Sequence, residues 1–255
     1  MTPITVAPGA DTWAAKTHVG AVRSNNEDSF AVVPDRGLFV VCDGMGGHDS
    51  GEVASLMACA TIRDRVSARH RSQHPPVARD LLVGDIRAAN QRVYRLGSGE
   101  RRPGTTVAAI LRARDRFIVA HVGDSRVYRL RRGALTQLTR DHSLANQLID
   151  MGHLDPNRAA DFRMRHVIAR ALGTHPEVAV DVQMSTALPG DVFLLATDGL
   201  NVVGPEAIRA ALHLPPEAAV EWLIASTLTE GAPDNVTVIV ARVGDAARTL
   251  KRRLP

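Results

Sequence analysis

Residues 38–55 read LFVVCDGMGGHDSGEVAS, and a structural interpretation of this 255-residue chain can be built outward from them. The apolar run Leu38–Cys42 is typical of a buried strand, and it stops at Asp43. After the glycines that follow, the side chain of Asp49 or Ser50 can cap the first turn of a helix. The stretch therefore predicts a strand, a glycine-rich turn that carries a carboxylate, and a helix that ends near Val66.

Two sequence periods alternate along the rest of the chain: short β-branched runs, and longer stretches with apolar residues three and four positions apart. Turn sequences such as PDRG at 34–37 and RRG at 131–133 join neighbouring runs, which favours antiparallel sheets. The predicted strands are Phe30–Val33, Leu38–Cys42, Thr105–Leu111, Phe117–Val122, Val127–Leu130, Val178–Met184, Val192–Ala196 and Val236–Val243. Further helices are expected at Val77–Leu96 and Pro216–Leu228, and the charged segment 141–176 is interpreted as a flap outside the sheets.

The composition limits the class of protein. A hydrophobic content of 45% allows a large core, so we expect a single domain with its core at about 12–243 and a short basic tail at 244–255. The two cysteines, Cys42 and Cys59, form neither a disulfide framework nor a CxxC metal motif, which fits a reducing compartment. The start of the chain lacks a secretory signal, and no apolar run approaches the ~20 residues that span a bilayer. We therefore expect a soluble, cytoplasmic protein.

The chain is basic, with a formal net charge of +4 and a pI near 9.7. Its basic residues are nearly all arginines, scattered without aromatic interleaving and without a recognisable nucleic-acid-binding motif. Surface arginines need no ligand to explain them. The charge therefore indicates solvated faces rather than a nucleic-acid partner.

Aspartates follow three of the predicted strands. Asp43, Asp124 and Asp198 each come after an apolar run and before a glycine or a serine. One Asp-Gly pair alone is ordinary turn chemistry, but strand ends can converge, and converging aspartates repel one another unless a cation neutralises them. The pair Glu27-Asp28, and Asp234 before the last strand, add further carboxylates. Oxygen ligands without histidine or cysteine favour Mg²⁺ or Mn²⁺, so the sequence predicts a hard-metal site.

Seven motifs occur in an order and at a spacing that resemble the metal-dependent protein phosphatases of type 2C, also called the PPM family. They are RSNNEDSF at 23–30, VVCDGMGGHDSGEVAS at 40–55, GTTVAAIL at 104–111, VGDSRVYRL at 122–130, LTRDHSL at 138–144, ATDGL at 196–200 and DNVT at 234–237. Within the second motif, DGMGGH resembles the bacterial serine/threonine phosphatase branch. The resemblance spans most of the chain and implies an α+β fold, a four-layer α/β/β/α sandwich with two antiparallel sheets.

Two divalent ions, Mn²⁺ or Mg²⁺, are implied by the same resemblance, with no other cofactor. Asp43 matches the carboxylate that bridges the two ions. Asp198 and Asp234 match the ligands of one ion, and Glu27 with the carbonyl of Gly44 matches those of the other.

Three further residues match functional positions of the family. Asp28 would orient a metal-bound water, and Asp124 resembles the ligand of a third, weaker ion in some bacterial members. Arg23 matches the phosphate-binding arginine, and a guanidinium fork suits a phosphate dianion. The alternative for Arg23 is a surface arginine that pairs with Glu27 or Asp28.

The activity implied is hydrolysis of phosphoserine and phosphothreonine in proteins, which would reverse the signalling of bacterial serine/threonine kinases. A water that bridges two cations has its pKa lowered towards neutrality, and the resulting hydroxide would attack in line, without a covalent phosphoenzyme. The expected partners are phosphorylated proteins and a cognate kinase, with no nucleic acid and no membrane. We expect the chain to act as a monomer.

Two departures from the family pattern affect the mechanism. Met45 stands where eukaryotic relatives carry the histidine thought to protonate the leaving group. His48 and a metal-bound water are alternative proton donors, and a hydrogen bond at the helix entry explains His48 equally well. In the flap, residues 161–166 replace a His-Pro-type segment found in many bacterial relatives, so substrate preference does not transfer.

Two competing interpretations can be weighed from the sequence. Cys59 and Arg65 fit the CX5R spacing of cysteine-dependent tyrosine phosphatases, but the residues between them lack glycine and continue an amphipathic helix. A pseudophosphatase that only binds phosphoproteins is the non-enzymatic alternative. The usual mark of such a protein is missing metal ligands, and every expected ligand is present here.

Overall fold

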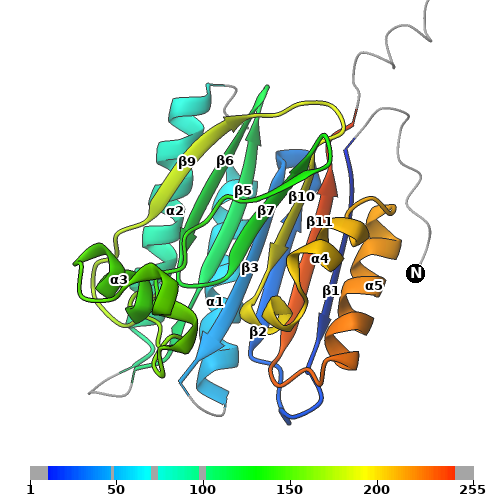
Figure 1. Cartoon of the computed structure of the whole chain (residues 1–255). Helices are drawn as coiled ribbons and strands as arrows, with labels where there is room; N and C mark the ends of the chain where they lie inside the picture. The colour runs from blue at the N-terminus through cyan, green and yellow to red at the C-terminus, as the bar shows by residue number, and fades with distance from the viewer. Residues whose placement is uncertain (1–10, 47–48, 70–73, 98–101, 245–255) are drawn as a thin grey trace, which may run out of the picture.

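The computed structural model describes residues 11–46, 49–69, 74–97 and 102–244, and it contains two antiparallel sheets enclosed by helices (Figure 1). The strands are β1 (Thr12–His18), β2 (Asp28–Val33), β3 (Leu38–Met45), β4 (Gly104–Thr105), β5 (Val107–Ala113), β6 (Arg116–Val122), β7 (Arg126–Arg131), β8 (Ala134–Gln137), β9 (Asp181–Thr186), β10 (Val192–Ala196) and β11 (Val236–Arg242). The helices are α1 (Asp49–Ala68), α2 (Pro75–Tyr94), α3 (Leu144–Asp150), α4 (Pro205–Ala211) and α5 (Pro216–Thr229), with 3-10 turns η1 (Pro34–Arg36), η2 (Pro156–Asp161) and η3 (Asp198–Val202).

One sheet has the order β2-β3-β5-β6-β9, with β4 paired to β3, and helices α1 and α2 cover its outer face (Figure 1). The helices bury Ile62, Leu82 and Ile86 against strand residues such as Val40 and Ile118. This apolar layer holds α1 against β3.

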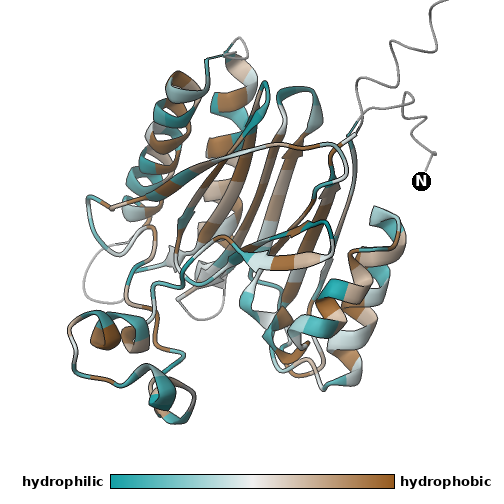
Figure 2. Ribbon diagram, turned by 45° about the horizontal axis from the view of Figure 1, so that its top comes forward, coloured by the Kyte–Doolittle hydropathy of each residue, from teal (hydrophilic) through white to brown (hydrophobic). Residues whose placement is uncertain are grey.

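The other sheet has the order β1-β11-β10-β7-β8, and α4 and α5 cover its outer face. Leu194 and Val238 of this sheet pack with Leu223 of α5 in one buried cluster. A third cluster fills the space between the two sheets, where the rings of Phe117 and Phe193 lie with their centroids 4.3 Å apart. The strands are accordingly the most apolar part of the ribbon (Figure 2). The predicted four-layer α/β/β/α architecture is confirmed.

Some elements were not predicted. β1 and β8 are edge strands whose side chains are half-buried or exposed, so neither contains a continuous apolar run. The short helix α4 was also missed, and β9 starts at Asp181 instead of Val178. Val178 and Val180 pack against the core without pairing in the sheet, so their apolar side chains indicate burial and not a strand. Within the described ranges, no helix combines the length and apolar character that crossing a bilayer requires.

Candidate metal centre

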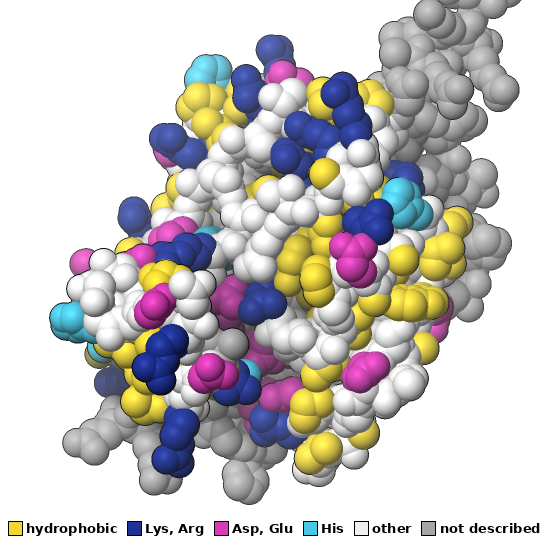
Figure 3. Space-filling view, viewed as in Figure 1, with side chains coloured by type: hydrophobic (Ala, Val, Ile, Leu, Met, Phe, Trp, Pro, Cys, Tyr) yellow, Lys and Arg dark blue, Asp and Glu magenta, His cyan; other side chains and the backbone are white. Residues whose placement is uncertain are grey.

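A cavity of about 650 Å³ lies where the acidic ends of β3 and β10 meet the start of β11. Acidic side chains gather in a hollow of the surface beside the α3 segment (Figure 3). The cavity is lined by Arg23, Ser24, Asn25, Glu27, Asp43, Gly44, Met45, Gly46, Ile168, Asp198, Asp234 and Asn235. The structure therefore brings together the predicted ligands Glu27, Asp43, Gly44, Asp198 and Asp234 with Arg23.

Hydrogen bonds that link the backbone of Asp43 to Thr105 and Thr106 hold this residue in place. Its amide N–H donates to Thr106 Oγ1 at 2.9 Å, and its carbonyl accepts from the Thr106 amide and the Thr105 hydroxyl, both at 2.8 Å. These bonds leave the carboxylate free to face the cavity. Burial, followed by the charge of Asp28, raises the pKa of Asp43 well above its usual value.

Close approach of three chain segments explains the glycines near Glu27. The Gly44 amide donates to the Glu27 carbonyl at 3.1 Å, and a Cβ on Gly44 would lie 2.1 Å from the Gly51 carbonyl oxygen. A Cβ on Gly51 would lie 2.2 Å from Glu27 Oε2. The Glu27 amide donates to Asn235 Oδ1 at 2.8 Å. Only glycine fits at position 44, where backbone atoms are this close, and a side chain at position 51 would displace the Glu27 carboxylate from the cavity wall.

Arg23 forms an ion pair with Asp234, whereas the sequence suggested Glu27 or Asp28 as its carboxylate partner. Its Nη2 donates to Asp234 Oδ2 at 2.8 Å, and this hydrogen bond raises the pKa of Arg23. Asp198 begins η3 directly after β10, and burial, followed by the charge of Asp234, raises its pKa. Proximity to Asp43 partly offsets this rise in the pKa of Asp198.

Asp28 lies behind the cavity rather than in its lining. It is 8% exposed, and its Oδ2 accepts from the hydroxyls of Thr197 and Thr237 at 2.8 and 2.7 Å. Burial raises the pKa of Asp28 to about 7, against the lowering effect of these two hydrogen bonds. The register of β2 against β3 pairs Asp28 directly with Asp43.

Asp124 is buried too, and it does not line the cavity. Burial, followed by the charge of Asp198, raises its pKa to about 7. The influence of Asp124 on the pKa of Asp43 likewise indicates that the two carboxylates share one electrostatic environment. The structure thus places Asp124 beside the cluster but not within it.

These residues fit divalent cations. Among the described residues, the Oδ1 atoms of Asp28, Asp124 and Asp198 are buried and have no hydrogen-bond partner. Buried carboxylate oxygens without partners are costly, and the carboxylates raise one another's pKa values. Hard cations with oxygen ligands would remove both penalties.

The remaining predicted residues are distributed as follows. Met45 lines the cavity, whereas His48 lies outside the described residues. Cys59 is 2% exposed within α1, and Arg65 donates to Asp85 Oδ1 at 2.9 Å, so the CX5R residues form helix rather than a phosphate-binding loop. Arg163 and Arg165 of the flap are exposed.

Sequence reasoning missed the residues that support the carboxylates: Thr106, Thr197, Thr237 and Asn235. All four lie inside motifs that were recognised. Thr197 and Asn235 are next to predicted ligands, Thr237 is the second residue of β11, and Thr106 directly precedes β5. The sequence therefore contained a signal that could have identified these supporting residues. Polar side chains at strand ends beside a carboxylate are expected to hydrogen-bond the carboxylate or its backbone.

Comparison with known proteins adds independent information. Residues 17–242 match the family described as protein phosphatase 2C. The serine/threonine protein phosphatase PstP of Mycobacterium tuberculosis is 41% identical over 243 residues, which are 91% of this chain and 45% of that relative. The chain thus spans about half the length of this relative. Protein phosphatase PhpP of Streptococcus pneumoniae is 32% identical over 239 residues, 90% of this chain and 96% of that relative.

Solved structures agree with this similarity. The crystal structure of the Mycobacterium tuberculosis phosphatase PstP superimposes with a TM-score of 0.83 at 37% identity, covering 92% of this chain and 99% of the other. A structure of the PstP catalytic domain in complex with two manganese ions gives a TM-score of 0.80, at the same identity and coverage. The phosphatase of S. agalactiae gives a TM-score of 0.84 at 30% identity, covering 91% and 99%.

Proposed function

This chain belongs to the protein phosphatase 2C family, and we propose that it hydrolyses phosphoserine and phosphothreonine in proteins with the help of Mn²⁺ or Mg²⁺. The observation that carries the proposal is the cavity in which four predicted ligand side chains and Arg23 lie together. Its substrates would be proteins phosphorylated by serine/threonine kinases, and a cognate kinase is a candidate partner.

The proposed ligands divide into two sets. Asp43, Asp198 and Asp234, with Glu27 and the Gly44 carbonyl, would hold two ions, and Asp124 would hold a third, weaker one. When bound, the cations supply an activated water at neutral pH and offset negative charge on the phosphoryl oxygens. The hydrogen bonds around Asp43 and Glu27 keep the ligand atoms in place before any ion arrives.

Protein side chains supply the rest of the chemistry. Arg23 would release Asp234 and bind two phosphate oxygens, because a phosphate dianion is a better partner for a guanidinium than a carboxylate that a cation has neutralised. Asp28, fixed by Thr197 and Thr237, would orient the attacking water. Hydrolysis would be direct. A phosphorylated side chain trapped during turnover would rule out this route.

Chelation provides the test of the proposed function. We expect the wild-type protein to hydrolyse a phosphothreonine peptide with Mn²⁺, to lose this activity in EDTA and to regain it when Mn²⁺ is restored. The C59S variant should keep wild-type activity, because the Cys59 thiol is buried in α1. Activity that survives chelation but disappears in C59S would indicate a cysteine mechanism. No turnover with either Mn²⁺ or Mg²⁺ would indicate a phosphoprotein-binding module.

Arg23 gives a second prediction. In R23A, kcat/KM for a phosphothreonine peptide should fall about tenfold to a hundredfold, the effect expected from losing a pair of charge-assisted hydrogen bonds. R23K should recover part of the loss, because lysine keeps the charge but not the fork. Arg140, an exposed arginine that pairs with Asp150 on α3, gives the matched control R140A. Equal effects of R23A and R140A would contradict a phosphate-binding role for Arg23.

A further inference from the structure

The motif LTRDHSL at 138–144 has no role in the proposed catalytic cycle, and the structure places it at the base of the flap, residues 141–176. Arg126 of β7 binds both carboxylate oxygens of Asp141, through Nε at 3.0 Å and Nη2 at 2.7 Å. Ser143 caps α3 by accepting from the Asn146 amide, and it forms an isolated β-bridge with Ile168. The motif therefore closes the flap into a loop whose two arms meet at its base.

His142 makes the densest set of contacts in this base. Its backbone amide donates to the Gly123 carbonyl at 2.9 Å, its Nδ1 accepts from the Gly123 amide at 3.1 Å, and its carbonyl accepts from the Ala169 amide at 2.7 Å. Its Nε2 lies 3.3 Å from Asp181 Oδ2, and its ring stacks on that of His121 at 4.6 Å. The His142 side chain thus joins the end of β6 to β9, and the His142 backbone joins the two arms of the flap.

The protonation state of His142 follows from these partners. A backbone amide can only donate, so Nδ1, which accepts from Gly123, is the unprotonated nitrogen of the neutral ring. Nε2 then carries the proton, which can bond to Asp181 but not to Arg170 Nη1, a second donor that lies 3.1 Å from Nε2. Burial, followed by the neighbouring His121 and Arg170, lowers the pKa of His142 and keeps it neutral. His121, His142 and Asp181 lie close enough to suggest a metal site. However, Nε2 of His142 is protonated, and the Arg170 guanidinium binds Asp181 at 2.6 Å, so a cation is disfavoured there.

Gly123 connects His142 to the metal centre. It directly precedes Asp124 and has φ +104°, and a Cβ there would lie 2.6 Å from Thr106 Cγ2. The Thr106 hydroxyl, which accepts from the Asp43 amide, also hydrogen-bonds the Ser125 hydroxyl at 2.6 Å. The turn of Gly123, Asp124 and Ser125 is therefore clamped between Thr106 on one side and His142 on the other.

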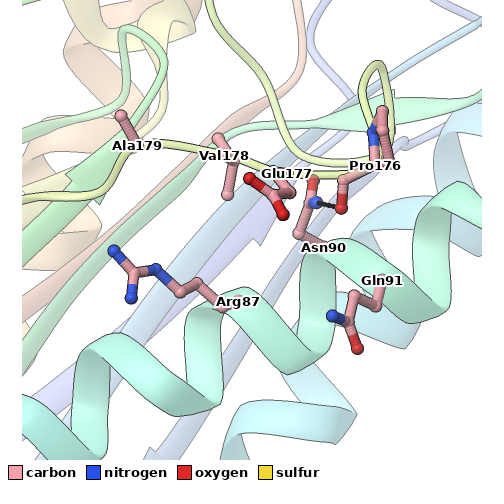
Figure 4. Close-up of a pocket in the computed structure, with 7 residues that line it drawn as sticks. All are labelled: Arg87, Asn90, Gln91, Pro176, Glu177, Val178 and Ala179. Carbon is pink, nitrogen blue, oxygen red and sulfur yellow. Dashed lines mark hydrogen bonds between the residues drawn. The ribbon is translucent and has the colours of Figure 1, made fainter.

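The other end of the flap is fixed independently of His142. Asn90 of α2 is 1% exposed, accepts from the Gly173 amide at 2.8 Å and donates to the carbonyls of His175 and Pro176 at 3.1 Å. Figure 4 shows the bond to Pro176. Asn90 and the segment that follows Pro176 line a separate cavity of about 490 Å³. Loss of His142 would therefore loosen the flap base and the Asp124 turn without detaching the flap from α2.

We propose that His142 is a positioning residue: its neutral imidazole binds the flap base to the Asp124 turn, so that one side chain sets both the cation affinity at Asp124 and the position of the flap beside the cavity. The inference rests on the proposed function for its catalytic consequence. Its structural part, the hydrogen bond from the Gly123 amide to Nδ1, does not.

Three variants separate this role from a general loss of packing. In H142N, the side-chain oxygen occupies the position of Nδ1 and can accept from the Gly123 amide. In H142Q, the oxygen reaches the position of Nε2 instead, and in H142A no acceptor remains. H142N and H142Q both remove the ring, so a generic packing defect would affect them equally, and thermal unfolding monitors that defect.

Hydrogen exchange at the Gly123 amide, measured by NMR on the metal-free protein, tests the bond without any assay of activity. We expect exchange about fivefold to tenfold faster in H142A and H142Q, with H142N within about twofold of wild type. Mn²⁺ titrations of the same proteins by calorimetry should show that the dissociation constant of the weakest binding phase rises about tenfold in H142A and H142Q and stays unchanged in H142N. The kcat/KM for a phosphothreonine peptide should fall in the same two variants and recover in H142N.

The outcomes are distinct. Equal exchange at Gly123 in H142N and H142Q, or wild-type exchange in all variants, would overturn the inference. Faster exchange without any change in Mn²⁺ binding would also overturn it, because the Asp124 turn would then not depend on His142. If the wild-type protein itself shows no metal-dependent turnover, the proposed function fails, while exchange and calorimetry still decide the role of His142.

Discussion

Replacing Asp43 by asparagine is expected to abolish Mn²⁺-dependent phosphatase activity and, at the same time, to stabilise the metal-free protein. The activity should fall at least about a thousandfold, because about 4 kcal/mol or more of transition-state stabilisation depends on the cations that Asp43 would hold. The gain in stability follows from the burial and the neighbouring carboxylates that raise the pKa of Asp43. An amide of the same shape carries no charge that burial and repulsion could penalise.

Thermal unfolding in EDTA and in saturating Mn²⁺ checks both parts. D43N should unfold a few degrees higher than wild type in EDTA, since about 1 kcal/mol corresponds to roughly 2–4 °C for a chain of this size. Mn²⁺ should stabilise the wild type by mass action and D43N much less. Asp64, exposed on α1 and paired with Arg63, supplies the control D64N, which should change neither activity nor stability. A D43N protein that is less stable in EDTA, or that keeps its activity, would contradict this account.

Without divalent cations, the protein is expected to lose stability as the pH rises from about 5 to about 7. The folded-state pKa values of Asp28 and Asp124 are each about 7, above the value of 3.8 for an unperturbed aspartate. Between pH 5 and pH 7, Asp28 and Asp124 have lost their protons in the unfolded chain but keep them in the folded chain. The folded state therefore binds more protons than the unfolded state in this range. The contribution of these two carboxyls to the free energy of unfolding is fully present below pH 3.8 and is lost as the pH rises through 7. The slope is about 1.4 kcal/mol per pH unit for each group.

Urea unfolding of metal-stripped protein at several pH values between 5 and 8 measures this slope. D28N and D124N should each reduce the slope by about 1.4 kcal/mol per pH unit, because each replaces one carboxyl of raised pKa with a neutral group, whereas Asp43 and Asp198 contribute to the slope in both variants. Saturating Mn²⁺ should flatten or reverse the dependence, since cation binding favours the ionised carboxylates. Stability of the stripped protein that is constant or rises between pH 5 and 7 would show that Asp28 and Asp124 are already ionised.

The two experiments depend on one physical arrangement. Asp28 and Asp43 are register partners on adjacent strands. Asp198, which follows β10 of the other sheet, lines the same cavity as Asp43 and adds to the effect of burial in raising the pKa of Asp43. Buried acids at such short range destabilise the protein when they stand alone and bind cations well for the same reason. If the proposed function holds, stability would be given up at this site in exchange for cation affinity, as is common at functional sites.

Much of this arrangement could be predicted from the sequence. The alternating apolar period marked most strands and the long helices, and the aspartates after the apolar runs indicated a hard-metal site. The Asp-Gly pairs were informative because a strand that ends in a tight turn presents the aspartate at the edge of the sheet. Local chemistry is enough for such predictions, since each depends on residues within a few positions of one another.

Other properties depend on pairings between distant segments. β1 lacks an apolar run, and its place in the sheet comes from its register with β11, in which Thr12 lies opposite Arg242. The sequence around Asp28 and Asp124 does not show that their pKa values lie near 7; burial, followed by the charge of Asp198, raises them in the folded protein. The tautomer of His142 likewise depends on Gly123, 19 residues away. Residue types and their order determined which chemistry the chain can perform. The tertiary structure determined which carboxylates are buried, which hydroxyls bind them and where each proton lies. Burial and hydrogen-bond partners arise from contacts between distant segments, which no local pattern encodes.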